Sequence, residues 1–154
     1  MTFNWRHGPS IAGYATYVAH EYSINFVPDI PIDRDSFDAE VSLDTLTLLV
    51  RRSDGRVAFP EGYFPKASWT EQPLAPPRAE RGQLYWEQRA SLVRGASVEA
   101  TETALAKFYD PDSSWLKIAT AEAGTGHLQV VEFCGGVLAE LDESKLVALW
   151  INLT

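Results

Sequence analysis

Cysteine, methionine and histidine are scarce in this sequence, and their scarcity excludes several kinds of protein. The 154 residues include one cysteine, one methionine and three histidines. Cys134 has no partner for an internal disulfide and stands in no catalytic pattern with a histidine or aspartate, so we interpret it as a small core residue. His7, His20 and His127 are scattered and show no metal-ligand spacing. We therefore expect neither a metal site nor a bound cofactor.

Long apolar runs and a basic leader are also missing. The first ten residues, MTFNWRHGPS, lack the basic region and the long apolar region of a signal peptide. No apolar run approaches the roughly 18 residues that a membrane-spanning helix needs. From these absences we expect a cytoplasmic protein with no membrane partner.

Positive charge is in deficit, and the deficit is uneven. The net charge is −8, from 13 lysines and arginines against 21 aspartates and glutamates. Residues 29–44 hold six acids and one arginine, whereas residues 51–94 hold eight bases and five acids. Such a protein repels nucleic acid and attracts cationic partners by long-range steering. Acidity that merely keeps the protein soluble is the competing interpretation.

Most of the sequence shows the alternating pattern that is typical of β-strands. Residues 14–27 alternate with strong β-formers, which predicts one long strand, although a helix over 10–22 competes with this interpretation. Asp54-Gly55 between two apolar runs predicts a hairpin with Val50 opposite Phe59. Pro60 then places the second strand of this hairpin at an edge or a bulge.

The stretch from Leu128 to Ile151 reads as a three-stranded meander that is apolar on both faces. Gly135-Gly136 suits a tight turn, and the register of such a turn places Glu132 opposite Ala139. The same register puts Glu132 and Cys134 on the face of Trp150. Both faces must be covered, by a helix, another sheet, the far wall of a barrel or a partner.

The remaining segments complete the predicted fold. We expect strands over 83–94 and 115–120, loops over 29–44 and 65–82, and one helix over 97–109 that begins at Ser97 as its N-cap. The whole of 1–154 is then a single domain of mainly β (α+β) class. Its antiparallel sheet of seven to eight strands, with about one helix, curves toward a barrel or a sandwich.

Two groups of side chains suggest chemistry, each with a plainer alternative. His20 and Glu132 are weak candidates for an acid–base pair in an aromatic pocket of a small-molecule-binding barrel or enzyme, lined by Tyr14, Tyr22, Trp86, Glu132 and Trp150. The favoured alternative is that Glu132 meets Arg89 or Arg94, or lies on the outer face. Basic and aromatic residues could also form an anion-binding patch, although decoration of an exposed hairpin tip is the stronger interpretation; they are Arg51, Arg52, Arg56, Arg78, Arg81, Arg89, Arg94, Trp69, Tyr85 and Trp86.

The leading hypothesis is a non-enzymatic, acidic binding protein that docks a basic protein partner. An immunity protein or inhibitor that covers the cationic site of a toxin or nuclease would have this size, charge and lack of motifs. The predicted contacts are acidic side chains with two aromatic anchors: Asp33, Asp35, Asp38, Glu40, Asp142, Glu143, Tyr63 and Trp69. A self-associating subunit, such as a homodimer, is a third hypothesis.

Overall fold

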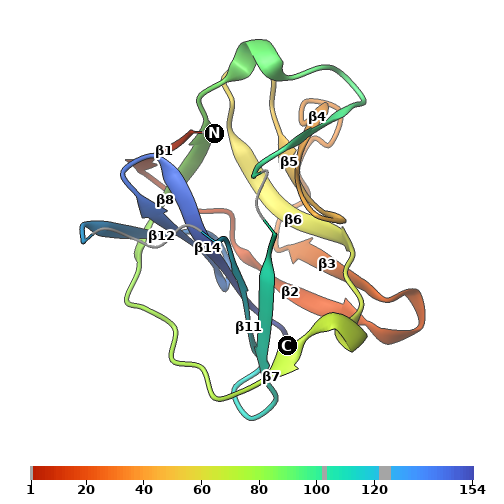
Figure 1. The fold of residues 1–154 in the computed structure, drawn as a ribbon. Helices are drawn as coiled ribbons and strands as arrows, with labels where there is room; N and C mark the ends of the chain where they lie inside the picture. Colours follow the sequence, from red (N-terminus) through yellow and green to blue (C-terminus); the bar gives the residue numbers. More distant parts are fainter. Residues whose placement is uncertain (1, 102–103, 122–125) are drawn as a thin grey trace.

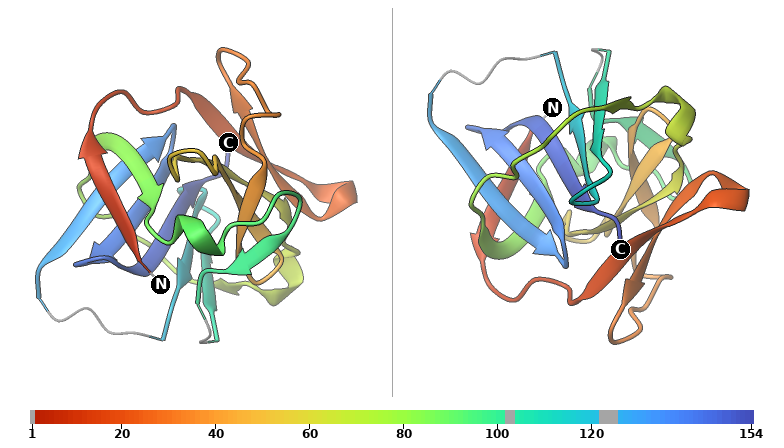
Figure 2. Two further views of the ribbon diagram at one scale, coloured as in Figure 1. Left: turned by 90° about the horizontal axis from the view of Figure 1, so that it is seen from above. Right: turned by 90° about the horizontal axis from the view of Figure 1, so that it is seen from below.

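The computed structural model describes residues 2–101, 104–121 and 126–154 and consists of two mixed β-sheets around one core (Figures 1 and 2). The eight-stranded sheet has the order β1 (Phe3–His7), β8 (Glu80–Trp86), β12 (Leu128–Cys134), β13 (Val137–Asp142), β14 (Lys145–Asn152), β11 (Trp115–Ala119), β10 (Ala106–Asp110) and β7 (Thr70–Glu71). The six-stranded sheet has the order β2 (Gly13–Val18), β3 (Ser23–Pro28), β6 (Val57–Tyr63), β5 (Leu46–Val50), β4 (Ala39–Leu43) and β9 (Ser97–Glu99). The mainly β class is confirmed, and the sheets do not form a closed barrel.

The predicted helix over 97–109 is wrong. Ser97–Glu99 pairs in parallel with β4, and Ala106–Asp110 pairs with β11; residues 102–103 lie outside the described part of the chain. Val98 packs against the core while Ser97 and Glu99 on either side of it are exposed, so the local alternation is that of a strand. Pairing with β4 and β11 outweighs a capping signal and a loose apolar spacing. The helices of the described residues are three short 3₁₀ turns: η1 (Ala19–Glu21), η2 (Lys66–Ser68) and η3 (Arg89–Ser91).

Residues 14–27 form a hairpin and not one strand. The η1 turn reverses the chain, and Tyr22 adopts left-handed backbone angles (φ 54°, ψ 37°) at its end. Tyr14 pairs with Val27, and Tyr17 pairs with Ile24. Alternation survives in each arm, but the reversal exchanges the faces, so that Ile24 shares a face with Tyr17 and not with Tyr14. Sequence alternation could not reveal a turn without glycine or proline.

The hairpin predicted around Asp54-Gly55 is confirmed, with a different register. Gly55 lies in the turn at φ 82°, and its N–H donates to the carbonyl of Arg51 (2.7 Å). Val50 pairs with Val57 and Leu48 with Pro60, so β6 carries an extra residue in a bulge beside the proline. The expected loop over 29–44 is wrong at its end, because Ala39–Leu43 forms β4.

The closing meander is confirmed as β12, β13 and β14, but a bulge at Phe133 changes its faces. Glu132 pairs with Leu138, and Cys134 pairs with Val137. Glu132 therefore stays on the face of Leu138 and Trp150, whereas Cys134 turns into the main core and is fully buried. Burial, together with the charge of Glu132, raises the pKa of the Cys134 thiol well above its usual range, which fits a core residue.

Both faces of the meander are covered within this chain. Its inner face shares one core with the six-stranded sheet. Its outer face, with Leu138, Ala148 and Trp150, packs against Leu74 and Ala79 of the proline-rich segment. In Figure 1 this segment runs from β7 to β8 along the lower side of the sheet. The buried carboxylate of Asp110 anchors the segment, because it accepts the N–H of Leu74 (3.0 Å).

Candidate functional site

The acidic residues 29–38 form a largely exposed turn before β4. The carboxylate of Asp33 accepts the N–H of Asp35 (3.2 Å), and the carbonyl of Asp33 accepts the hydroxyl of Ser36 (2.7 Å). Asp33 and Asp35 are both exposed. Glu40 is half-buried on β4, and its carboxylate accepts the hydroxyl of Ser97 (2.9 Å). Four of the predicted partner-binding acids, Asp33, Asp35, Asp38 and Glu40, thus lie on or beside one turn.

Cations neutralise some acids of this region and leave others unpaired. Arg52 Nε lies 2.9 Å from Asp38 Oδ2. Desolvation opposes the change, but hydrogen bonds from the Arg52 side chain and backbone lower the pKa of Asp38. Among the described residues, no lysine, arginine or histidine lies within ion-pair distance of Asp33, Asp35 or Glu40. These three carboxylates therefore supply the negative charge of the turn that no cation compensates.

Arg34 attaches the acidic turn to the six-stranded sheet. Its guanidinium donates two hydrogen bonds to the carboxylate of Glu61 on β6 (3.1 and 2.8 Å). Two parallel N–H···O bonds define both position and orientation. Glu61 precedes Tyr63 by two residues on the same strand, and both therefore project from the same face. The acidic turn consequently lies beside Tyr63.

Exposed apolar side chains lie in two pairs on this outer face of the six-stranded sheet, one pair at each end of β3. The tyrosine patch consists of Tyr14, Tyr22, Val27 and Tyr63, which are 48%, 55%, 41% and 53% exposed. Tyr14 and Val27 form a cross-strand pair, and the rings of Tyr22 and Tyr63 meet edge to face at 6.4 Å. These are four of the seven large hydrophobic side chains that are exposed in the described part of the chain, with Ile30, Val93 and Leu128.

Sequence reasoning placed Tyr63 in the predicted surface but assigned Tyr14 and Tyr22 to an internal pocket. The alternation of residues 14–18 and 23–28 carries the signal for an exposed face that includes Tyr14 and Val27. Nothing in the sequence signals the left-handed backbone of Tyr22, which is uncommon for a bulky residue. That conformation brings its ring to Tyr63.

Trp69, the second predicted anchor, lies elsewhere. Its half-buried ring contacts Tyr17 at 5.3 Å, Tyr109 at 5.3 Å and Phe64 at 6.0 Å. Tyr17 alternates with Tyr14 along β2, so Trp69 packs on the side of the hairpin opposite to the tyrosine patch. The structure therefore does not bring Trp69 together with Tyr63.

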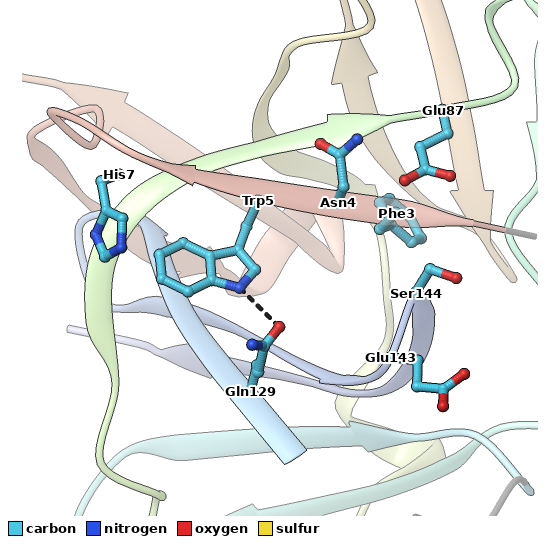
Figure 3. A pocket seen from close by; sticks show the side chains of 8 residues that line it. All are labelled: Phe3, Asn4, Trp5, His7, Glu87, Gln129, Glu143 and Ser144. Carbon is cyan, nitrogen blue, oxygen red and sulfur yellow. Dashed lines mark hydrogen bonds between the residues drawn. The ribbon is translucent and has the colours of Figure 1, made fainter. Parts of the chain in front are cut away.

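The turn of Asp142 and Glu143 belongs to a different region. It joins β13 to β14 and adjoins the start of β1, because the N–H of Phe3 donates to the carbonyl of Ser144 (2.7 Å). Glu143 lines an open groove of about 450 Å³ between β1 and β12, in which Trp5 donates to Gln129 (3.0 Å; Figure 3). The remaining lining residues are Phe3, Asn4, His7, Glu87 and Ser144. In Figure 2 this turn and the segment 29–38 lie on opposite sides of the molecule.

His20 and Glu132 do not come together. The His20 side chain is 82% exposed at the tip of the β2–β3 hairpin, 3.7 Å from Glu21. Glu132 lies on the other sheet, where it faces Arg81 (3.6 Å) and accepts the N–H of Gly136 (3.0 Å). The cation near Glu132 is thus Arg81, and the expected contact with Arg89 or Arg94 is replaced. The other proposed pocket residues are dispersed: Tyr14 and Tyr22 are exposed, Trp86 is in the main core, and Trp150 is on the outer face of the eight-stranded sheet.

No group of three or more potential metal ligands occurs among the described residues. No helix in the described ranges has the length and apolarity needed to cross a bilayer. Comparison of the sequence with protein-family models and with curated proteins gave no match.

Proposed function

We propose that the chain is a non-enzymatic binding protein that docks a basic protein partner on the outer face of its six-stranded sheet. The observation that carries the proposal is the Arg34–Glu61 pair, which holds the exposed acids Asp33 and Asp35 beside Tyr63. Aromatic anchors surrounded by complementary charge are the usual composition of a protein interface. An immunity protein or inhibitor that covers a cationic site is the biological role that such a surface fits best.

The exposed tyrosine rings and the carboxylates beside them can contact the same partner side chain, an arginine. A partner's guanidinium can stack on an exposed tyrosine ring and pair with a neighbouring carboxylate, and both contacts favour arginine. Glu40 and Glu99 extend the negative charge along the same face, through the pairing of Glu40 with Ser97 and of Ser42 with Glu99. The alternative of an acid–base enzyme has no comparable support, because its candidate residues are dispersed.

An NMR titration with a hexa-arginine peptide tests the placement. We expect shifts at Tyr14, Tyr22, Tyr63 and residues 33–40, and binding that weakens about fivefold or more from about 20 to about 200 mM salt, because exposed charges are screened. Asp35→Asn should weaken binding more than Glu71→Gln, an exposed acid on β7. Tyr63→Ser should likewise weaken it more than Val93→Ser, whose side chain is 59% exposed.

Three outcomes would contradict the proposal. Shifts confined to the turn of Asp142 and Glu143 would place the interface on the other sheet. Equal losses in Asp35→Asn and Glu71→Gln would mean that only net charge matters. A dimer in sedimentation that Tyr63→Ser dissociates would make this face an interface between copies of the chain.

A further inference from the structure

The edge strand β1 differs from the other three edge strands in the described part of the chain. β1 and β7 lie at the edges of the eight-stranded sheet, and β2 and β9 lie at those of the six-stranded sheet. β7 has only two residues and β9 only three. Leu153 and Thr154 cover the middle of β2, because Leu153 bridges to Ala15 and the carbonyl of Ala15 accepts the N–H of Thr154 (3.1 Å). β1 has five residues, and in the described ranges no strand pairs with its outer edge.

The hydrogen bonds between β1 and β8 define which backbone groups of β1 face outward. The two strands are antiparallel, and the N–H of Glu87 donates to the carbonyl of Thr2 (3.1 Å) at the start of the ladder. Hydrogen-bonded and non-hydrogen-bonded pairs alternate in such a ladder. The next pair, Phe3 and Trp86, is therefore not hydrogen-bonded, and the N–H of Phe3 donates instead to the carbonyl of Ser144 (2.7 Å).

Trp5 and His7 continue the outward-facing set that begins at Phe3. Their N–H and C=O groups point away from β8, whereas those of Asn4 and Arg6 point toward it. Among the described residues, no hydrogen bond joins the backbone of Trp5 or His7 to another element. Native proteins often protect such an edge with a lysine, a proline or a bulge, and β1 has none of these. Its unpaired groups are a ready template for an added strand.

A groove of about 450 Å³, here named the Trp5 groove, adjoins this outer edge. Four of the five residues of β1 line it, together with Glu87, Gln129, Glu143 and Ser144. Ser144 accepts the outward N–H of Phe3 and also lines the groove, which therefore reaches the edge of the strand. The volume lies within the range of roughly 300–1,000 Å³ that is usual for binding pockets.

The Trp5 groove is acidic. Glu87 and Glu143 are exposed, and neither has a cation within ion-pair distance among the described residues. None of the described residues that line the groove is a lysine or an arginine. In Figure 3 both carboxylates lie at the end of the groove opposite to His7. A cationic side chain beside this edge would compensate them.

We propose that the outer edge of β1 binds an extended, basic segment of another protein, which adds to the eight-stranded sheet as a further strand. Main-chain hydrogen bonds to Trp5 and His7 supply affinity, and a lysine or arginine side chain in the Trp5 groove supplies specificity. Alternate residues of the added strand point to the same face, so two basic residues with one residue between them suit the groove. This site goes beyond the proposed function, because none of its residues belongs to the tyrosine patch or to the acidic turn.

Titration with the pentapeptide Thr-Lys-Val-Lys-Thr, with both ends blocked, tests the proposal by NMR and amide exchange. The control is the same peptide with a methyl group on every backbone amide nitrogen, which keeps the charge and removes the donors. We expect the unmodified peptide to bind at least about fivefold more tightly, because only it can pair with the edge. It should also slow exchange at Trp5 and His7, whose amides should exchange faster than those of Asn4 and Arg6 in the free protein.

Two variants at one position separate the backbone from the side chain. His7→Pro removes an outward N–H without removing a bond to β8, and edge strands tolerate proline in that orientation. We expect His7→Pro to weaken peptide binding at least about fivefold, whereas His7→Ser, which loses the same ring but keeps the N–H, should change it less than about twofold. Glu143→Gln should weaken binding more than Glu71→Gln, a change to an exposed acid on β7.

Four outcomes would overturn the proposal. Equal binding of the two peptides would mean that charge alone holds them, and equal losses in His7→Pro and His7→Ser would mean that the outward N–H has no part. Shifts confined to the tyrosine patch would remove this site and leave the proposed function intact. A dimer in sedimentation that His7→Pro dissociates would assign the edge to a second copy of the chain instead of another protein.

Discussion

Replacement of Gly135 by alanine should strongly destabilise the protein, because Gly135 lies where the two sheets meet. Its N–H donates to the carbonyl of Ile11 (2.9 Å), and the N–H of Ile11 donates to the carbonyl of Phe133 (3.1 Å). A Cβ atom at position 135 would lie 2.0 Å from the carbonyl oxygen of Gly13 and 2.9 Å from its carbon. These are backbone atoms, which cannot rotate away as a side chain does.

The size of the expected loss of stability follows from the backbone movement that the new Cβ atom would force. Relief of the overlap requires β2 and the β12–β13 turn to separate by roughly 1 Å, and forced overpacking of this kind typically costs about 1–3 kcal/mol. The two backbone hydrogen bonds that cross the gap would be weakened, at roughly 0.5–1.5 kcal/mol each. We expect a loss of about 3–5 kcal/mol, a large part of the roughly 5–15 kcal/mol that stabilises a typical domain.

Urea denaturation followed by tryptophan fluorescence measures this loss, with Gly95→Ala as the control. Gly95 has φ 73° and nothing within 4 Å of its Cβ position, so alanine there meets only the left-handed backbone cost of about 1–2 kcal/mol. Comparable losses in the two variants would refute the steric argument. A Gly135→Ala protein with native midpoint would also show that the two sheets can separate freely at this point.

Two further predictions concern single side chains. Backbone hydrogen bonds, first that from Leu74, lower the pKa of Asp110, so its stabilising contribution is present above the unfolded pKa of about 4 and is lost as the pH falls through the lower folded value. Asp110→Asn should therefore make the urea midpoint less dependent on pH between about pH 2 and about pH 4, and it should speed amide exchange at Leu74. A pH dependence of the midpoint equal to that of the unmodified protein would contradict the anchoring role. Cys134 is fully buried with its thiol pKa raised, so a thiol reagent should modify it only at the rate of unfolding, and rapid modification of the native protein would contradict the core assignment.

Local signals predicted those parts of the fold that depend on neighbours in sequence. Asp54-Gly55 and Gly135-Gly136 identified two hairpins because each turn requires backbone angles that glycine adopts readily. The bulge at Phe133 was not predictable in this way, since it arises where β12 must pair with β13 and also meet β8. That bulge moves Cys134 to the core while Glu132 stays outside. A pattern of period two cannot report an inserted residue.

The same limit applies to the candidate sites. The acidic segment and Tyr63 were identifiable from charge and composition, but their proximity depends on one long-range pair between Arg34 and Glu61. Arg6 of β1 stacks on Tyr85 of β8, and Arg56 before β6 pairs with Tyr85 through the backbone, so only the sheet topology brings these residues together. The seven arginines of residues 51–94 suggested an anion-binding patch, with decoration of an exposed hairpin tip as the stronger alternative, and Arg6 was in neither interpretation.

Coverage of the meander bears directly on the choice among binding hypotheses. A sheet that is apolar on both faces requires a second layer on each side, and an uncovered face would have argued for a second copy of the chain. Leu74 and Ala79 cover the outer face here, and Trp150 is only 5% exposed beneath them. The closing strands thus supply no argument for self-association. Four of the seven large apolar side chains exposed in the described ranges belong instead to the tyrosine patch, and its Tyr63 lies beside acids that have no cation within ion-pair distance there. A basic partner surface that buried the patch would cover these side chains and pair with the acids.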